Sequence, residues 1–121
     1  MLGDVMFQPN VRGPAKMLRI YVGQDDRWEG KPLYEQIVAR IKAADLAGAT
    51  VYRGTMGYGA DQRMHPSGRL GLSHDLPIMI TVVDSEDRIR EVLPMLDEMV
   101  TEGLVVLSDV EVIRYQHAGV R

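Results

Sequence analysis

The segment GTMGYGADQRMHPSGRLGLSHD, residues 54–75, contains most of the residues whose types suit ligand chemistry. Glycine lets backbone N–H groups approach and encircle an anion, so the run GTMGYG suits a phosphate loop. Its spacing is G-x-x-G-x-G rather than the G-x-G-x-x-G of dinucleotide sites, and no helix is expected after it to hold a pyrophosphate at its N-terminus. From the residues alone, a turn and the edge of a ligand site both remain open.

Basic side chains make this segment locally cationic, although the whole chain carries a net charge of -3. The basic residues are Arg63, Arg69, His65 and His74, together with Arg53 immediately before the segment. A solvated loop is the simplest explanation. Loops of this length in compact domains are usually functional or disordered. The loop could serve as a docking surface for an acidic partner or as a clamp over a bound anion, and we favour the docking surface.

The residue types give little indication of a metal site or a catalytic site. His65 and His74 lie nine residues apart, without a closer histidine pair or a carboxylate cluster, so we expect no metal site. The chain has no cysteine, which excludes disulfides, thiolate zinc sites and a cysteine nucleophile. No nucleophile is accompanied by a base and a third, orienting group. We therefore expect a protein that is not an enzyme, and a small hydrolase is kept as an alternative.

The size and composition limit the class of protein further. A chain of 121 residues and 13.6 kDa suffices for one two-layer domain. A pI near 5.5 argues against a nucleic-acid binder, and an aromatic content of 6% argues against a surface for single-stranded RNA. No apolar run reaches the roughly 20 residues of a membrane span, and no signal-peptide pattern is present, so we expect a cytoplasmic protein.

Hydrophobic periodicity predicts the elements that must position these residues. Strands are expected at residues 17–22, 49–56, 76–83 and 104–115, and helices at 32–48 and 84–103. Asp84 and Ser85 are expected to cap the second helix, Pro94 to kink it, and Trp28 to anchor a loop to the core or to a neighbouring subunit. Residues 1–16 are expected to form a loosely ordered extension, residues 17–116 the domain and residues 117–121 a tail.

The element order β-α-β-β-α-β predicts an α+β fold of the ferredoxin-like type. Two helices would cover one face of a four-stranded antiparallel sheet and leave the other face open. Outward strand residues such as Met79, Val83 and Ile113 are apolar, so this open face needs a cover. A homo-oligomer that packs its sheets together would supply one.

Three segments, in this order and spacing, resemble one protein family: LRIYVGQDDRWEGKPLYEQIV, LAGATVYRGTMGYG and HDLPIMITVVDSEDRI. The family is domain of unknown function 190, itself similar to the PII signalling proteins, and the resemblance covers residues 17–115. It implies a ferredoxin-like homotrimer that binds adenine nucleotides between subunits. It also implies that the loop 54–75 reports the bound state to a partner such as a membrane transporter or an enzyme.

The resemblance also implies a set of ligand contacts. They are Gly48, Thr50, Gly57, Tyr58, Gly59, Arg63 and Arg114. The first two match positions that PII proteins place beside the adenine, and the GYG of residues 57–59 matches the start of the PII loop. The two arginines would supply positive charge to a phosphate.

The chain departs from the PII pattern at three places. Only TEG, residues 101–103, stands where PII proteins carry a glycine-rich loop with a lysine, and Gln116 replaces a second arginine. The modified tyrosine of the PII loop has no counterpart between Gly59 and Asp75. These departures favour a smaller nucleotide, such as AMP, ADP or cyclic AMP, or no nucleotide. A ligand-free trimeric interaction module is the alternative.

Overall fold

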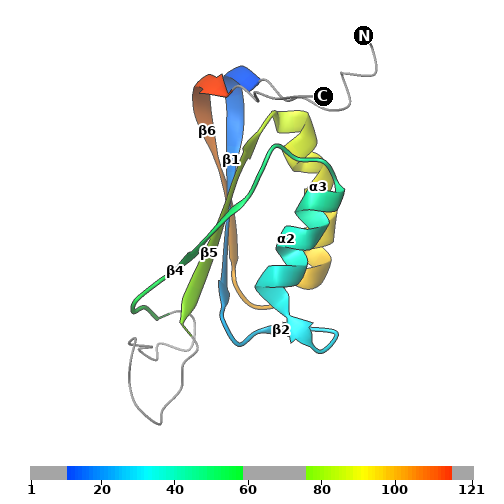
Figure 1. Ribbon diagram of the computed structural model, residues 1–121, viewed down its shortest axis with the longest axis vertical. Coiled ribbons are helices and arrows are strands. Elements are labelled where there is room, and N and C mark those ends of the chain that lie inside the picture. Colours follow the sequence, from blue (N-terminus) through cyan, green and yellow to red (C-terminus); the bar gives the residue numbers. More distant parts are fainter. Residues whose placement is uncertain (1–10, 59–75, 116–121) are drawn as a thin grey trace.

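The computed structural model describes residues 11–58 and 76–115. Its elements are β1 (Val11–Gly23), β2 (Arg27–Trp28), β3 (Lys31–Pro32), α2 (Leu33–Ala43), β4 (Thr50–Arg53), β5 (Pro77–Asp84), α3 (Glu86–Met99) and β6 (Leu104–Tyr115). Apart from the short ribbon of β2 and β3, the order is β-α-β-β-α-β (Figure 1). Neither helix of this described part is long and apolar enough to cross a membrane.

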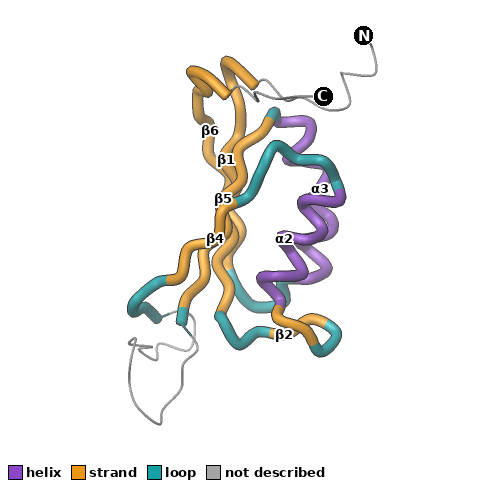
Figure 2. The backbone as a smooth tube through the Cα atoms, viewed as in Figure 1, coloured by secondary structure: helices purple, strands orange, loops and turns teal. Residues whose placement is uncertain are grey.

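The four long strands form one sheet in the order β4-β5-β1-β6, and every neighbouring pair is antiparallel. Both helices lie on the same face of this sheet (Figures 1 and 2). The predicted ferredoxin-like fold is therefore confirmed. β5 is a central strand, because it lies between β4 and β1.

The core lies between the sheet and the two helices because the apolar residues follow the period of each element. The strands contribute Leu18, Ile20, Val22, Ile78, Ile80 and Val82, and the helices contribute Leu33, Ile37, Ile41, Ile89, Val92, Leu96 and Met99. Burial of each such side chain stabilises the fold by roughly 1.5–3 kcal/mol. Trp28 packs against this core, as expected for an anchor.

The opposite face of the sheet is uncovered by any described element. Its residues alternate with the core residues, and strand register places one of them from each strand in a single row. This row is Tyr52 (β4), Met79 (β5), Tyr21 (β1) and Leu104 (β6). Tyr52 is 51% exposed, Tyr21 36% and Leu104 55%. We refer to these four residues as the open-face row.

The first strand is longer than predicted. It begins at Val11 rather than at Met17, so residues 11–16 of the expected extension belong to the sheet and pair with β6. The local pattern conceals this because Gly13, with a φ of 94°, lies where the register shifts, and Pro14 follows it. Residues 1–10 and 116–121, the rest of the expected extension and tail, lie outside the described residues.

Both helices end earlier than predicted. The first ends at Ala43 and not at Gly48, because Asp45 takes a left-handed φ of 64° and the Arg88 guanidinium donates to the carbonyl oxygens of Ala44 and Asp45. The second ends at Met99 and runs through Pro94. Its predicted cap is confirmed at Ser85, whose hydroxyl accepts a hydrogen bond from the Arg88 backbone N–H at 3.4 Å.

Candidate functional site

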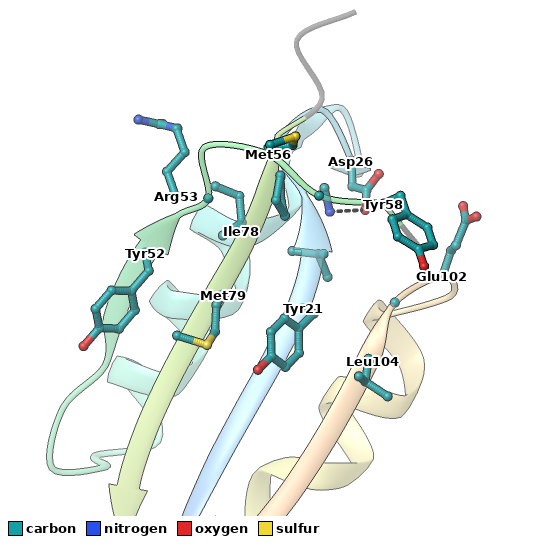
Figure 3. Close-up of a pocket in the computed structure, with 16 residues that line it drawn as sticks. Tyr21, Asp26, Tyr52, Arg53, Met56, Tyr58, Ile78, Met79, Glu102 and Leu104 are labelled. Carbon is teal, nitrogen blue, oxygen red and sulfur yellow. Dashed lines mark hydrogen bonds between the residues drawn. The ribbon is translucent and has the colours of Figure 1, made fainter. Parts of the chain in front are cut away.

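A groove of about 720 Å³ opens on the uncovered sheet face, at the end where the 54–75 loop begins (Figure 3). The open-face row forms its floor, and Met56 and Tyr58 line it from the first residues of the loop. Met56 is 55% exposed and Tyr58 67%. Tyrosine rings offer flat apolar surfaces, and methionine adapts to irregular ones. The groove therefore suits a planar ring better than a strongly hydrated group.

The charged residues of the groove are mostly acidic. Asp26 and Glu102 line it, and Arg53 is the one cation among its described lining residues. Arg53 Nε donates to Gln24 Oε1 at 3.2 Å, and the side chain extends outward from the edge strand (Figure 3). Asp26 Oδ2 accepts a hydrogen bond from the Gly23 backbone N–H at 2.9 Å. The described lining is thus apolar and aromatic with an acidic rim.

Two glycines at the start of the loop allow the chain to pack on Pro77. A Cβ atom at Gly54 would lie 2.6 Å from Pro77 Cγ, and one at Gly57 would lie 3.1 Å from the same atom. Gly54 N also donates to the Pro77 carbonyl oxygen at 2.7 Å. Close packing at the base of the loop accounts for both glycines. Gly57 nevertheless also lines the groove, where a residue predicted to contact the ligand must lie.

Other predicted residues lie at the far end of the sheet. Gly48 belongs to the α2–β4 loop, residues 44–49, in which Ala47 N donates to Asp84 Oδ2 at 2.8 Å. Tyr115 Oη donates to the Ala47 carbonyl oxygen at 3.2 Å, so the end of β6, with Arg114, adjoins the same loop. Thr50 is the first residue of β4 and is exposed.

The predicted ligand residues therefore fall into two groups. Gly57 and Tyr58 lie beside Pro77, where β5 begins, whereas the Gly48 loop lies beside Asp84, where β5 ends. Seven strand steps of about 3.3 Å separate these ends by roughly 23 Å. One chain does not bring the two groups together. Gly59 and Arg63 lie outside the described residues.

Sequence reasoning missed several residues of the groove. Tyr21, Tyr52 and Leu104 were not singled out, and Met79 was recognised only as an outward residue. Alternation assigned these side chains to the non-core face, but strand register is required to bring them into one row. Their shared apolar character on an otherwise solvent-facing surface was the available signal.

No cluster of three or more potential metal ligands occurs within residues 11–58 and 76–115. Two exposed carboxylates on other parts of the chain have lowered pKa values. A hydrogen bond from Arg90 lowers the pKa of Glu86, and one from Lys16 lowers the pKa of Asp109. The described residues of the groove thus offer shape, aromatic surface and charge.

Comparison with known proteins identifies the family. The model of the DUF190 family, described as uncharacterized ACR, COG1993, matches residues 15–112. The chain belongs to the DUF190 family. A UPF0166 protein of Aquifex aeolicus is 37% identical over 98 residues, covering 81% of this chain and 92% of the relative. A UPF0166 protein of Methanocaldococcus jannaschii is 38% identical over 101 residues, covering 83% and 93%.

Solved structures show that this DUF190 chain has the PII-like fold. CPII of Thiomonas intermedia, bound to ADP and bicarbonate, is similar with a TM-score of 0.61 at 23% identity, covering 82% of this chain and 88% of CPII. A putative PII-like signalling protein of Thermus thermophilus is similar with a TM-score of 0.62 at 18% identity, covering 88% and 94%. Both likenesses agree with the fold predicted from the sequence.

Proposed function

We propose that this DUF190 protein is a non-enzymatic, PII-like regulator that binds a small adenine nucleotide or a related anion between subunits. The observation that carries the proposal is the groove at the base of the 54–75 loop. It lies on a fold shared with CPII, whose solved structure contains ADP and bicarbonate. A ligand in this groove would contact the first residues of the loop and would thereby change how the loop docks.

The two groups of predicted residues support a site shared between subunits. They lie at opposite ends of β5, so a small ligand that contacts both must lie between two copies of the chain. In the proposed homotrimer, one copy supplies Gly57 and Tyr58, with Gly59 and Arg63 of the same loop. The neighbouring copy supplies Gly48, Thr50 and Arg114.

AMP, ADP and cyclic AMP are the proposed ligands. The groove offers aromatic surface for an adenine, while its described lining offers only one cation for phosphate. Occupancy would favour one arrangement of the 54–75 loop, which would then dock a membrane transporter or an enzyme target. Such coupling requires that the ligand bind the two loop states with different affinity.

Calorimetric titration with AMP, ADP, ATP and cyclic AMP tests the proposal. Heat with at least one nucleotide is expected, and both Tyr58→Ala and Arg114→Ala are expected to weaken binding by about tenfold or more. Absence of heat with every nucleotide would contradict the proposal. It would favour the ligand-free interaction module, in which the exposed open-face row and loop bind a partner protein directly.

Mixed trimers test whether the site is shared. Tyr58→Ala would damage one half of every cleft and Arg114→Ala the other half, so neither homotrimer should bind normally. Co-expression of the two variants should restore one undamaged cleft in each mixed trimer. Failure of the mixed trimers to regain binding would argue that both residues act on the same copy. Phosphatase or hydrolase activity of the purified protein would instead support the small-hydrolase alternative.

A further inference from the structure

The turn between α3 and β6, residues 101–103, brings Glu102 to the rim of the groove (Figure 3). Gly103 makes this approach possible, because a Cβ atom there would overlap the Tyr21 carbonyl oxygen and would lie 3.0 Å from Val100 Cγ1. The turn is therefore pressed against the end of β1. This contact fixes the backbone that carries the Glu102 carboxylate beside Tyr21 and Leu104 of the floor.

Among the described residues, little positive charge lies near the Glu102 carboxylate. Within the described part of the chain, no ion pair involves Glu102 or Asp26. Arg53, the lining cation, donates to Gln24 and extends away from the other groove residues (Figure 3). Asp26 accepts a hydrogen bond from one backbone N–H, which is a neutral donor. Both carboxylates therefore contribute negative potential at the mouth of the groove.

Floor and rim favour different parts of a nucleotide. The tyrosine and methionine side chains of the floor favour a planar, apolar ring. The two carboxylates of the rim repel phosphate, and each added phosphate group increases the negative charge of the ligand by about one at neutral pH. The same groove thus favours the ring of a nucleotide and repels its phosphate groups.

We propose that Glu102, with Asp26, makes this groove selective for nucleosides and nucleotides of low charge, and that Glu102 is the residue that disfavours polyphosphates. The inference rests on the proposed function and narrows its ligand class. The penalty that Glu102 imposes should therefore be absent for adenosine and should increase from cyclic AMP through AMP and ADP to ATP. Glu102 is the residue to vary, because it is exposed and its side chain supports no described hydrogen bond, whereas Asp26 holds the backbone of Gly23.

Titration of the full-length protein with adenosine, cyclic AMP, AMP, ADP and ATP tests this inference, both in EDTA and in Mg²⁺. In EDTA, Glu102→Gln is expected to lower the Kd for ATP by about tenfold and for ADP by about fivefold, and to leave the Kd for adenosine within about twofold. The matched control is Glu91→Gln, which removes the same charge from an exposed position of α3 and should change no Kd.

Two results would overturn the inference while leaving the proposed function intact. In the first, Glu102→Gln changes the Kd for adenosine and the Kd for ATP by the same factor, or changes neither. The other is weaker ATP binding by Glu102→Gln in Mg²⁺ only, which would make Glu102 a ligand of phosphate-bound magnesium. Absence of binding by every compound, in both the native protein and the variant, would reject the proposed function itself and this inference with it.

Discussion

Two glycines of this chain illustrate how differently one residue type can be used. Gly103 has a φ of 157°, and its missing Cβ lets the turn contact the Tyr21 carbonyl oxygen. Gly48, in contrast, has no heavy atom within 4 Å of the place where a Cβ would lie. Packing within the subunit therefore requires glycine at the first position and does not require it at the second.

Gly103→Ala should lower the free energy of unfolding by roughly 2 kcal/mol, because the turn must move away from β1 to admit the methyl group. Gly48→Ala should change it by no more than about 0.5 kcal/mol. Urea unfolding followed by circular dichroism measures both. Weaker nucleotide binding by Gly48→Ala at unchanged stability would indicate that the ligand requires glycine at this position. Equal free energies of unfolding for the two variants would contradict the packing argument.

Two exposed carboxylates give the stability a dependence on pH. The hydrogen bond from Lys16 lowers the pKa of Asp109 below its ordinary value of 3.8, and the hydrogen bond from Arg90 lowers that of Glu86 below 4.5. A carboxylate with a lowered folded-state pKa contributes stability that is complete above its unfolded pKa. That contribution is lost as the pH falls through the folded-state pKa.

Lys16→Met should therefore reduce the loss of stability on acidification, because Lys16 lowers the pKa of both carboxylates. Urea midpoints measured from about pH 6 down to about pH 3 should show a shallower decline than in the native protein. A titration followed by nuclear magnetic resonance should find the pKa of Asp109 raised toward its ordinary value. Lys42→Met, at an exposed position of α2, should leave both measurements unchanged.

At the scale of elements, the α2–β4 loop is held by side chains from three other elements. Asp84, 1% exposed at the end of β5, accepts hydrogen bonds from Ala47 N at 2.8 Å and Ser85 N at 2.7 Å. Arg88 of α3 donates to the carbonyl oxygens of Ala44 and Asp45, and Tyr115 of β6 donates to that of Ala47. These hydrogen bonds hold the loop that carries Gly48 in a fixed position relative to the sheet.

Asp84→Ala should lower the free energy of unfolding by roughly 3 kcal/mol, because it leaves buried backbone donors and the Arg88 guanidinium without this carboxylate. Amide hydrogen exchange should show the larger local effect at residues 44–49 and little change at the Gly54 end of β4. Asp97→Ala, an exposed residue of α3, is the control and should be close to neutral. Unchanged exchange at residues 44–49 in Asp84→Ala would show that the loop is held by its other contacts.

At the scale of the whole molecule, one face of the sheet is left uncovered by the described elements (Figures 1 and 2). The open-face row and the half-buried Met17 and Val83, which pair across β1 and β5, are apolar on this face. The proposed trimer would pack the part of this face around Met17 and Val83 against neighbouring sheets and would leave the open-face row to line the ligand cleft. Burial of apolar surface is worth about 25 cal/mol per Å². The same packing would bring the two ends of neighbouring sheets into one cleft.

Val83→Glu should dissociate the assembly, because it places a charge on the packed face while leaving the helix-side core intact. Sedimentation velocity should find a trimer for the native protein and a folded monomer for the variant. Ala39→Glu, at an exposed position of α2 on the opposite layer, should remain trimeric. A native protein that sediments as a monomer would remove the basis for a site shared between subunits.

The sequence by itself determined the order of the four long strands and the two helices, the core and the cap of α3. Apolar residues at period two in β5 and at helical spacing around Ile89 report local geometry, and Ser85 caps the helix that it precedes. These features depend on neighbours within a few residues, which is why pattern alone suffices. The family resemblance added candidate contact residues that pattern could not name, and it left their arrangement in space unspecified.

Only the tertiary structure decided how distant segments meet. The start of β1 at Val11 depends on pairing with β6, and the end of α2 depends on Arg88, which follows it by more than 40 residues. Register across four strands assembled the groove floor, and the length of β5 separated Gly57 from the Gly48 loop. Strand register and long-range hydrogen bonds are properties of pairs of segments, so no single stretch of the chain encodes them.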